Sequence, residues 1–316
     1  MKTLSAIIEL DIRNLFKSHM SSDEDPQFKG LLDVYHYAMF PAGKLIRSKL
    51  IWSTLCDLNQ SDLVNLHTAN FPNHQLFSAA IEAHHSYTLV HDDMPCMDND
   101  DYRRGKLSCH KNFGEWKALL SGDGLLNLSY EFLSRIKHQN LSKLLSLFSK
   151  NLGSKGLIYG QYLDLNTSSS KLDFNTIKKI HYLKTGLLFS TAMNGSALLS
   201  SDNTSDNLIK NIESSVESIG PLFQFLDDLT ELSSIKDNSH ELEINPWINF
   251  KKDTLECTKL FLKKTNKSLE ELPNTNLVIR ELFQKIKLFL IANKKEISPF
   301  FNQGELDPMI SLLDQS

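Results

Sequence analysis

The sequence has no excess of positive charge, few cysteines and no long hydrophobic run. Its 34 basic and 38 acidic residues leave a formal net charge of -4, which argues against a nucleic-acid partner. Its 4 cysteines form no CxxC pair, so neither a zinc ribbon nor a disulfide framework is indicated. No apolar stretch reaches the ~18 residues of a membrane span, and Glu9 and Asp11 interrupt the apolar run near the start. We expect a cytoplasmic protein without nucleic-acid or membrane partners.

Strand signals are scarce as well, whereas helical periodicity extends over most of the chain. Apolar residues recur at spacings of three and four in segments 4–16, 76–90, 125–136, 141–152, 175–199 and 277–295. The breaks are short and none resembles a flexible linker; they fall at 21–26, 70–73, 166–170, 201–205, 234–246 and 273–276. The sequence therefore predicts a single large all-α domain over residues 1–316, with about ten or more helices.

The densest charge cluster is HDDMPCMDNDDYRRG, which begins at His91. Carboxylates this close repel one another by roughly 4 kcal/mol per pair near a surface, so water or a cation must neutralise them. On a straight helix Asp98 would point away from Asp92, but the proline between them allows a bulge that brings Asp98 back. Paired carboxylates suit Mg²⁺, and Arg103 and Arg104 suggest phosphate recognition. A solvated acidic turn is the alternative.

A second acidic cluster lies in FQFLDDLTE. Asp227 and Glu231 are four positions apart and share one helix face, with Asp228 beside them and Gln224 one turn earlier. The surrounding residues are apolar, which favours a helix whose acids face an interior cleft over an exposed helix end. Two such clusters on apolar helices favour a shared metal site.

Several polar residues accompany these acids. A charge inside an apolar helix is costly unless it is paired, and this applies to Lys184. Ordinary alternatives exist for each candidate: solvated bases at a helix start, a core histidine, or a surface pair. The candidates are Gly43, Lys44, Arg47, His85, Gln161, Asp164, Lys184 and Thr185.

The ordered motifs resemble those of the trans-isoprenyl (polyprenyl) diphosphate synthases, of the bacterial farnesyl diphosphate synthase type, over about residues 35–300. The two acidic segments resemble the family's aspartate-rich motifs, and AGKLIR, GQYLDL and LKTG stand in the family's order. The resemblance implies an all-α isoprenoid synthase fold around a central cleft, and a homodimer. It also implies a chain-elongating prenyltransferase that condenses isopentenyl diphosphate with dimethylallyl or geranyl diphosphate to give farnesyl diphosphate.

The resemblance assigns roles to individual residues. Mg²⁺ would be the cofactor, about three ions in each active site, with Mn²⁺ as a substitute. Its ligands would be Asp92, Asp93, Asp98, Asp227, Asp228 and Glu231. Isopentenyl diphosphate would be held by Gly43, Lys44, Arg47, His85 and Arg104. Arg103 would contact the allylic diphosphate, and catalysis would involve Arg103, Lys184, Thr185 and Gln224. Tyr87 would close the product pocket, although helical arithmetic alone puts Thr88 beneath Asp92.

The chain departs from the family pattern at several positions. Leu45 and Ser48 replace the usual arginine and proline, and Glu231 replaces an aspartate. After the second motif the loop is short, with Leu242 near the usual lysine and Lys236 as a possible substitute. Four alternatives follow: a geranyl diphosphate synthase, a geranylgeranyl diphosphate synthase, a class I terpene cyclase, or a weakly active or silent regulatory subunit.

Overall fold

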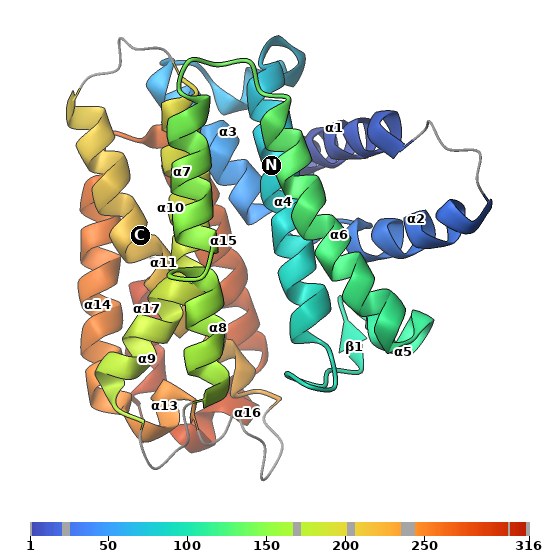
Figure 1. Cartoon of the computed structure of the whole chain (residues 1–316). Helices are drawn as coiled ribbons and strands as arrows, with labels where there is room; N and C mark the ends of the chain where they lie inside the picture. Colours follow the sequence, from blue (N-terminus) through green and yellow to red (C-terminus); the bar gives the residue numbers. More distant parts are fainter. Residues whose placement is uncertain are drawn as a thin grey trace. The chain divides into compact units, whose positions relative to one another are not determined.

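The computed structural model describes residues 2–20, 26–166, 172–200, 206–234, 244–302 and 304–313. Within these ranges the regular elements are helices and one two-stranded hairpin, which confirms the all-α class (Figure 1). None of the helices described is both long and apolar enough to cross a bilayer. Contacts divide the chain into unit 1 (Met1–Trp52 and Ser61–Leu145) and unit 2 (Ser53–Gln60 and Ser146–Ser316). Each unit is described by itself, and the single-domain expectation stays a prediction.

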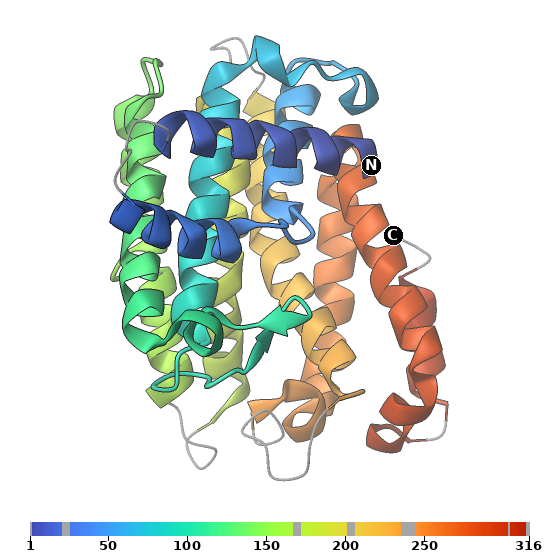
Figure 2. The same ribbon diagram turned by 90° about the vertical axis from the view of Figure 1, so that its right-hand side faces the viewer.

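Unit 1 contains five helices, two 3-10 turns, the hairpin, and the first parts of α3 and α7. The bounds are α1 (Lys2–Met20), α2 (Pro26–Met39), α3 (Ile46–Leu58), η1 (Leu63–Asn65), η2 (Thr68–Asn70), α4 (Pro72–Asp92), β1 (Tyr102–Arg103), β2 (Lys106–Leu107), α5 (Cys109–Phe113), α6 (Glu115–Ser134) and α7 (Leu141–Leu152). Helices α1 and α2 lie across the long axes of α4 and α6 (Figures 1 and 2).

The pair α4 and α6 forms the centre of unit 1. The two helices pack against each other, and α4 carries small buried side chains, since Ala79, Ala80 and Ala83 are 0% exposed. On α6 a Cβ at Gly122 would overlap the imidazole of His91, so only glycine allows this approach. This packing fixes the end of α4, where the first acidic cluster begins.

Unit 2 contains the remaining elements. Their bounds are α8 (Leu157–Asn166), α9 (Phe174–His181), the π-helical turn η4 (Tyr182–Gly186), α10 (Leu187–Leu198), α11 (Asp206–Glu231), α13 (Pro246–Asn249), α14 (Lys251–Ser268), α15 (Pro273–Ala292), α16 (Lys294–Ile297), η5 (Ser298–Phe300) and α17 (Leu306–Leu312). Helix α11 packs against α10, α14 and α15 (Figure 1).

The core of unit 2 forms around α11. Leu222, Phe225, Leu226 and Leu229 follow the helical spacing of three and four, and each is 0% exposed. The indole Nε1 of Trp247 donates to the carbonyl of Phe225 at 2.6 Å. The apolar stripe therefore anchors α11, and the acids of the second cluster lie in the last turns of the same helix.

The periodic segments 4–16, 76–90 and 141–152 each lie within one helix. Segments 125–136 and 277–295 run past the ends of α6 and α15, and segment 175–199 is divided into α9, η4 and α10. The break expected at 273–276 instead forms the first turn of α15. The hairpin β1–β2 was not predicted. Its strands are two residues long, which is too short for a period-two pattern to be visible.

Candidate active site

The first acidic cluster starts at the end of α4. The helix ends at Asp92, and the N–H of Asp93 donates to the carbonyl of Leu89 at 3.1 Å. The chain then turns, and the N–H of Asp98 donates to the carbonyl of Asp92 at 2.9 Å. The backbone thus returns Asp98 to Asp92, which is the bulge that the sequence predicts. Asp92 is half-buried and Asp98 is exposed.

Asp93 has a different environment. It is 2% exposed, and its Oδ1 accepts hydrogen bonds from Nε and Nη2 of Arg103 at 2.8 and 2.5 Å. Nη2 also donates to Asp100 at 2.9 Å. Burial is the largest effect and would lower the pKa of Arg103, but the bond to Asp93 and the charges of Asp93 and Asp100 together outweigh it and raise that pKa. Asp93 and Arg103 therefore form a charged pair, and Arg103 is oriented by it.

The two arginines lie on the hairpin. Arg103 pairs with Lys106 across the strands, and Arg104 and Gly105 form the turn with φ of 54° and 76°. Positive φ at both central residues is the geometry of a type I′ turn, which joins two-residue hairpins. Lys106 Nζ donates to the carbonyls of Tyr37 and Phe40 at 2.5 and 2.9 Å, which fastens the hairpin to the end of α2.

Arg104 lies against Gly43, the residue before Lys44. A Cβ at position 43 would come within 3.2 Å of the Arg104 Nε, so glycine makes room for the guanidinium. Arg104 accepts a left-handed backbone that costs roughly 1–2 kcal/mol, and its Nη1 donates to the Pro41 carbonyl at 3.4 Å. Gly43 and Arg104, both predicted to hold isopentenyl diphosphate, are therefore neighbours, and Lys44 is exposed beside them.

Arg47 and His85 form the second contact within the predicted diphosphate group. Arg47 Nη1 lies 3.0 Å from His85 Nε2. A guanidinium can only donate, so Nε2 accepts and the imidazole proton is on Nδ1. Desolvation, followed by the charges of Arg47 and Arg104, lowers the pKa of His85 well below its usual value. The histidine is therefore neutral and orients Arg47.

The two chain-length candidates lie on α4. Tyr87 is 7% exposed, and its ring makes edge contacts with His84 and His91 at centroid distances of 4.6 and 5.6 Å. Burial, then the charge of Asp92, raises the pKa of Tyr87 to about 12. The Thr88 hydroxyl instead donates to the carbonyl of His85 at 2.8 Å. The ring of Tyr87 is thus held in place on α4, five positions before Asp92.

In unit 2, the turn η4 carries Lys184 and Thr185 and is packed between two glycines. A Cβ at Gly160 of α8 would lie 2.7 Å from the Lys184 backbone nitrogen. A Cβ at Gly220 of α11 would overlap the Cα of Gly186. Single π-helical turns inside helices are frequent at functional sites. The two close approaches fix the turn against both neighbouring helices.

We predict that Gly220→Ala lowers the free energy of unfolding by about 1–3 kcal/mol, because the added methyl group overpacks a backbone contact. The displaced α11 should also weaken the hydrogen bond that the Thr185 hydroxyl donates to Gln224 of α11. Activity should fall as a result. Gly30→Ala is the control, since Gly30 lies in α2 with nothing within 4 Å of a new Cβ, and it should stabilise by about 0.5–1 kcal/mol. Urea unfolding measures both, and equal effects would contradict the prediction.

One turn beyond each glycine lies a polar partner of η4. Asp164 follows Gly160 on α8, and its Oδ2 accepts a bond from Lys184 Nζ at 2.7 Å. Gln224 follows Gly220 on α11, and its Oε1 accepts from the Thr185 hydroxyl at 2.9 Å. The glycine contacts and the polar contacts thus position Lys184 and Thr185 together.

The second acidic cluster continues this polar chain. Gln224 Nε2 donates to Asp228 Oδ1 at 2.8 Å, and Asp228 is 6% exposed. Asp227 and Glu231 are half-buried. Burial, then the charge of Glu231, raises the pKa of Asp228 well above its usual value. The end of α11 is tied down by Asn245, whose Nδ2 donates to the Asp228 carbonyl at 2.9 Å.

The predicted residues therefore form two groups, one in each unit. Unit 1 holds Gly43, Lys44, Arg47, His85, Tyr87, Thr88, Asp92, Asp93, Asp98, Arg103 and Arg104, and unit 2 holds Lys184, Thr185, Gln224, Asp227, Asp228 and Glu231. Within each group, hydrogen bonds and close contacts join most of the members. Residues Lys236 and Leu242 lie outside the described ranges.

A family model described as polyprenyl synthetase matches residues 28–241. The chain belongs to the polyprenyl synthetase family. The farnesyl diphosphate synthase of Buchnera aphidicola from Acyrthosiphon pisum is 34% identical over 279 residues, which cover 86% of this chain and 89% of that protein. The farnesyl diphosphate synthase of Micrococcus luteus is 33% identical over 72% of this chain and 75% of its own length.

Solved structures of the polyprenyl synthetase family match the fold. A geranyltransferase from Legionella pneumophila superposes with a TM-score of 0.75 at 26% identity, and the match covers 93% of this chain and 98% of that one. A structure described as an FPP/GFPP synthase, from Zymomonas mobilis, gives a TM-score of 0.71 at 30% identity, with 87% and 95% covered. The isoprenoid synthase fold expected from the sequence is confirmed.

Some contacts of this polyprenyl synthetase were not predicted. Ser48, which departs from the family's proline, donates through its N–H and its hydroxyl to Glu82 at 3.3 and 2.7 Å. A proline has no N–H and could not make the first bond. Neither Asn245 nor Glu82 was a candidate, because each acts through a partner distant in sequence. Asp164 was a candidate with a surface pair as the alternative, and its bond to Lys184 was not predicted.

Proposed function

We propose that this polyprenyl synthetase is a chain-elongating trans-prenyltransferase that condenses isopentenyl diphosphate with dimethylallyl or geranyl diphosphate to give farnesyl diphosphate. The single observation that carries the proposal is the first acidic cluster. Its backbone returns Asp98 to Asp92 beside a hairpin that presents Arg103 and Arg104. Carboxylates next to paired guanidinium groups suit a metal-bound diphosphate. The relatives named farnesyl diphosphate synthase support the same activity.

The acids fit Mg²⁺ as the cofactor, with Mn²⁺ as a substitute. Mg²⁺ in phosphate-transfer sites takes one or two carboxylates and completes its shell with water and substrate oxygens. The described residues contain no group of three or more side chains already gathered as a metal cage, which is consistent with that mode. We assign Asp92, Asp98, Asp227 and Glu231 as the ligands, because these residues are half-buried or exposed. Asp93 and Asp228 are buried against protein donors and would support them.

The two groups of residues have complementary chemical tasks in this proposal. Mg²⁺, when bound, would neutralise the diphosphate charge that develops as the allylic C–O bond breaks. Arg103, oriented by Asp93, contacts the allylic diphosphate. Lys44, Arg47 and Arg104 hold isopentenyl diphosphate, with His85 orienting Arg47. In unit 2, Lys184, Thr185 and Gln224 are assigned to the allylic cation, from which water must be excluded.

Product length provides a specific test of Tyr87. We predict that Tyr87→Ala shifts the products from C15 towards C20 and longer chains, because it removes a buried ring from the proposed pocket floor. The same change should lower the free energy of unfolding by about 3–5 kcal/mol. Chromatography therefore compares the share of each product length in the total product, rather than the rate. Tyr87→Phe keeps the ring and should keep the C15 product. Unchanged products from Tyr87→Ala would refute the assignment.

We also propose a homodimer. On α6, Trp116 is 66% exposed, and Leu119 and Leu120, about one helix turn later, are 48% and 52% exposed. Large apolar side chains gathered on one exposed face are typical of an interface. The mass of the purified chain by light scattering tests this assembly. The cytoplasmic location stays a prediction.

The experiment for the activity combines the purified chain, Mg²⁺, labelled isopentenyl diphosphate and either dimethylallyl or geranyl diphosphate. We expect labelled farnesyl diphosphate from both allylic substrates and no product when Mg²⁺ is chelated. A cyclic hydrocarbon formed without isopentenyl diphosphate would indicate a terpene cyclase. A chain that makes no product by itself would contradict the proposal.

A further inference from the structure

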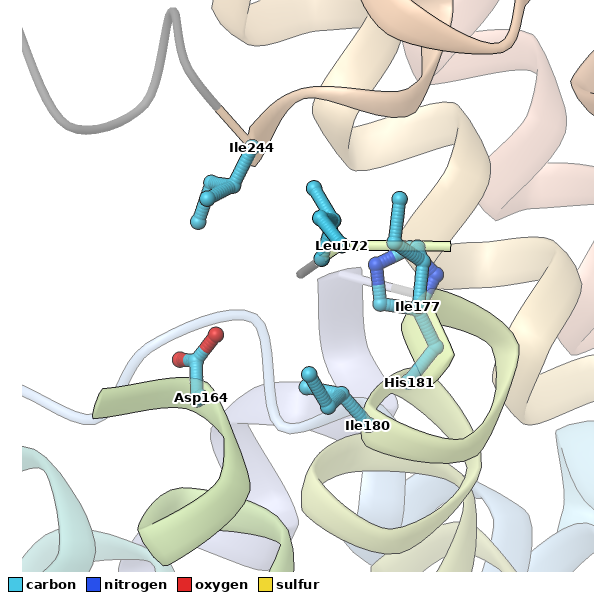
Figure 3. A pocket seen from close by; sticks show the side chains of 6 residues that line it. All are labelled: Asp164, Leu172, Ile177, Ile180, His181 and Ile244. Atoms are coloured by element: carbon cyan, nitrogen blue, oxygen red, sulfur yellow. The ribbon is translucent and has the colours of Figure 1, made fainter. Parts of the chain in front are cut away.

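Two hollows in the described part of the chain differ in the chemistry of their walls. In unit 2, the hollow beside Asp164 is walled chiefly by aliphatic side chains (Figure 3), namely Leu172, Ile177, Ile180 and Ile244. The carboxylate of Asp164 already accepts a bond from Lys184 Nζ at 2.7 Å. In unit 1, the hollow between the hairpin, α2 and α4 has three cationic side chains in its walls, those of Arg103, Arg104 and Lys106. Both arginines have an assigned role with diphosphate, and Lys106 does not.

The hairpin that carries the two arginines is held in place by little apolar packing. Its strands are two residues long, and the apolar side chains of Tyr102 and Leu107 are exposed. An isolated hairpin is marginally stable in water unless it packs against other elements. The hollow lies between the hairpin and α4, so packing on that side is incomplete. The position of the hairpin therefore depends on polar anchors.

Lys106 is such an anchor. Its Nζ donates to the carbonyls of Tyr37 and Phe40, at the end of α2, at 2.5 and 2.9 Å. The ammonium also stands 3.8 Å from the centroid of the Tyr37 ring, which is a cation–π contact. In return, the Tyr37 hydroxyl donates to the carbonyl of Leu107 at 2.8 Å. Carbonyls at the end of a helix carry partial negative charge, so an ammonium group is favoured there.

The two arginines depend on this anchor to different degrees. Arg103 is held by the carboxylates of Asp93 and Asp100, through bonds of 2.8, 2.5 and 2.9 Å. Arg104 Nη1 donates to the Pro41 carbonyl at 3.4 Å, which is long for an N–H···O bond. Loosening the hairpin should therefore displace Arg104, whereas Arg103 stays with its carboxylates.

We propose that Lys106 and Tyr37 are positioning residues that fix Arg104 for the binding of isopentenyl diphosphate. The carbonyls to which Lys106 bonds lie just before Gly43 and Lys44 in the chain. The same contacts therefore place Arg104 against these two residues of the proposed diphosphate group. The proposal rests on the proposed function and deepens it, and it requires no contact between Lys106 and the substrate.

Kinetics in which each diphosphate is varied separately distinguish this positioning from a general loss of structure. We expect Lys106→Met, which keeps a long side chain without the ammonium group, to raise KM for isopentenyl diphosphate by about 10–100-fold. KM for geranyl diphosphate should change less than about threefold, because Arg103 keeps its charge-assisted bonds. Tyr37→Phe removes only the bond to Leu107 and should raise KM for isopentenyl diphosphate by about two- to tenfold. Equal rises for the two substrates, or no rise in Lys106→Met, would overturn the proposal.

The matched control is Lys111→Met. Lys111 follows the hairpin on α5, and its Nζ pairs with the exposed carboxylate of Asp101 at 2.8 Å. Both KM values of this variant should stay within about twofold of those of the natural chain. If this control raised KM for isopentenyl diphosphate as much as Lys106→Met, the loss of a positive charge would explain the effect, and the positioning role would be refuted.

Calorimetry with isopentenyl diphosphate alone separates this proposal from the proposed function. If the natural chain binds isopentenyl diphosphate but forms no prenyl product, the proposed function fails, while the Kd of Lys106→Met still tests the positioning and should rise by about 10–100-fold. If Lys106→Met does not fold, Tyr37→Phe decides, and an unchanged Kd in that variant would contradict the proposal. A natural chain that binds no isopentenyl diphosphate would overturn both.

Discussion

Replacing Asp92 by alanine is expected to reduce prenyl transfer by about 10³-fold, which corresponds to ~4 kcal/mol of transition-state stabilisation. Asp92 is the last residue of α4, and the Asp98 N–H bonds to its carbonyl. In our proposal its carboxylate holds a metal on the departing diphosphate. Its loss leaves that charge less well compensated when the C–O bond breaks.

The matched control for this change is Asp101→Ala. Asp101 is an exposed acid of the same segment, and its carboxylate pairs with Lys111 at 2.8 Å. An exposed pair of this kind contributes at most about 1 kcal/mol, so the control should retain activity within a few fold. Initial rates at saturating Mg²⁺ and substrates are compared for both variants. If Asp92→Ala kept more than a tenth of the natural rate, a metal-holding role for Asp92 would be refuted.

Replacing Asp57 by alanine is expected to lower the free energy of unfolding of unit 2 by about 3 kcal/mol. Asp57 lies near the end of α3 and is 4% exposed. Its Oδ1 accepts bonds from the N–H and the side chain of Asn274, at 2.7 and 2.9 Å. Its Oδ2 accepts bonds from the N–H and the hydroxyl of Thr275, at 3.0 and 2.7 Å. Alanine would leave the first N–H groups of α15 buried without an acceptor.

Hydrogen exchange followed by mass spectrometry localises this effect. Peptides from α15 should lose protection in Asp57→Ala, while peptides from α4 and α6 in unit 1 should change little. Asp62→Ala is the control: it removes an exposed cap, whose Oδ1 accepts from the N–H of Val64 at 2.8 Å, and should cost about 1 kcal/mol or less. Similar protection of α15 in the natural chain and in Asp57→Ala would show that the four bonds contribute little.

Periodicity predicted the helices well wherever one face is buried. Segment 141–152 corresponds to α7, and the stripe of Leu222, Phe225, Leu226 and Leu229 lies in the core of unit 2. The turn η4 was not predicted: the extra residue of a π-helical turn shifts the phase of a helix, but α10 beyond it is buried on nearly all sides, so its sequence has no single apolar face whose shift could be seen. The glycine contacts at Gly160 and Gly220 also depend on which helices meet, which the sequence does not state.

The candidate site was predicted by motif far better than by local geometry. Helical arithmetic turned Asp98 away from Asp92, and the proposed bulge corrected this, as the bond between them confirms. Helical arithmetic could not tell that Asp92 and Asp93 have different environments. Asp93 is 2% exposed and bound to Arg103. Burial of one acid in an adjacent pair depends on tertiary packing, which the sequence does not state.

The two groups of candidate residues belong to separately described units, and the central proposal is that Asp92 and Asp227 act on one diphosphate. A crystal structure with Mn²⁺ and a non-hydrolysable allylic diphosphate analogue tests this most directly, because Mn²⁺ is located by its anomalous scattering. The account predicts ions bridging the diphosphate, with oxygens of Asp92 and Asp227 each ~2.1 Å from an ion. Asp92 and Asp227 on separate surfaces, with no common ligand, would contradict it.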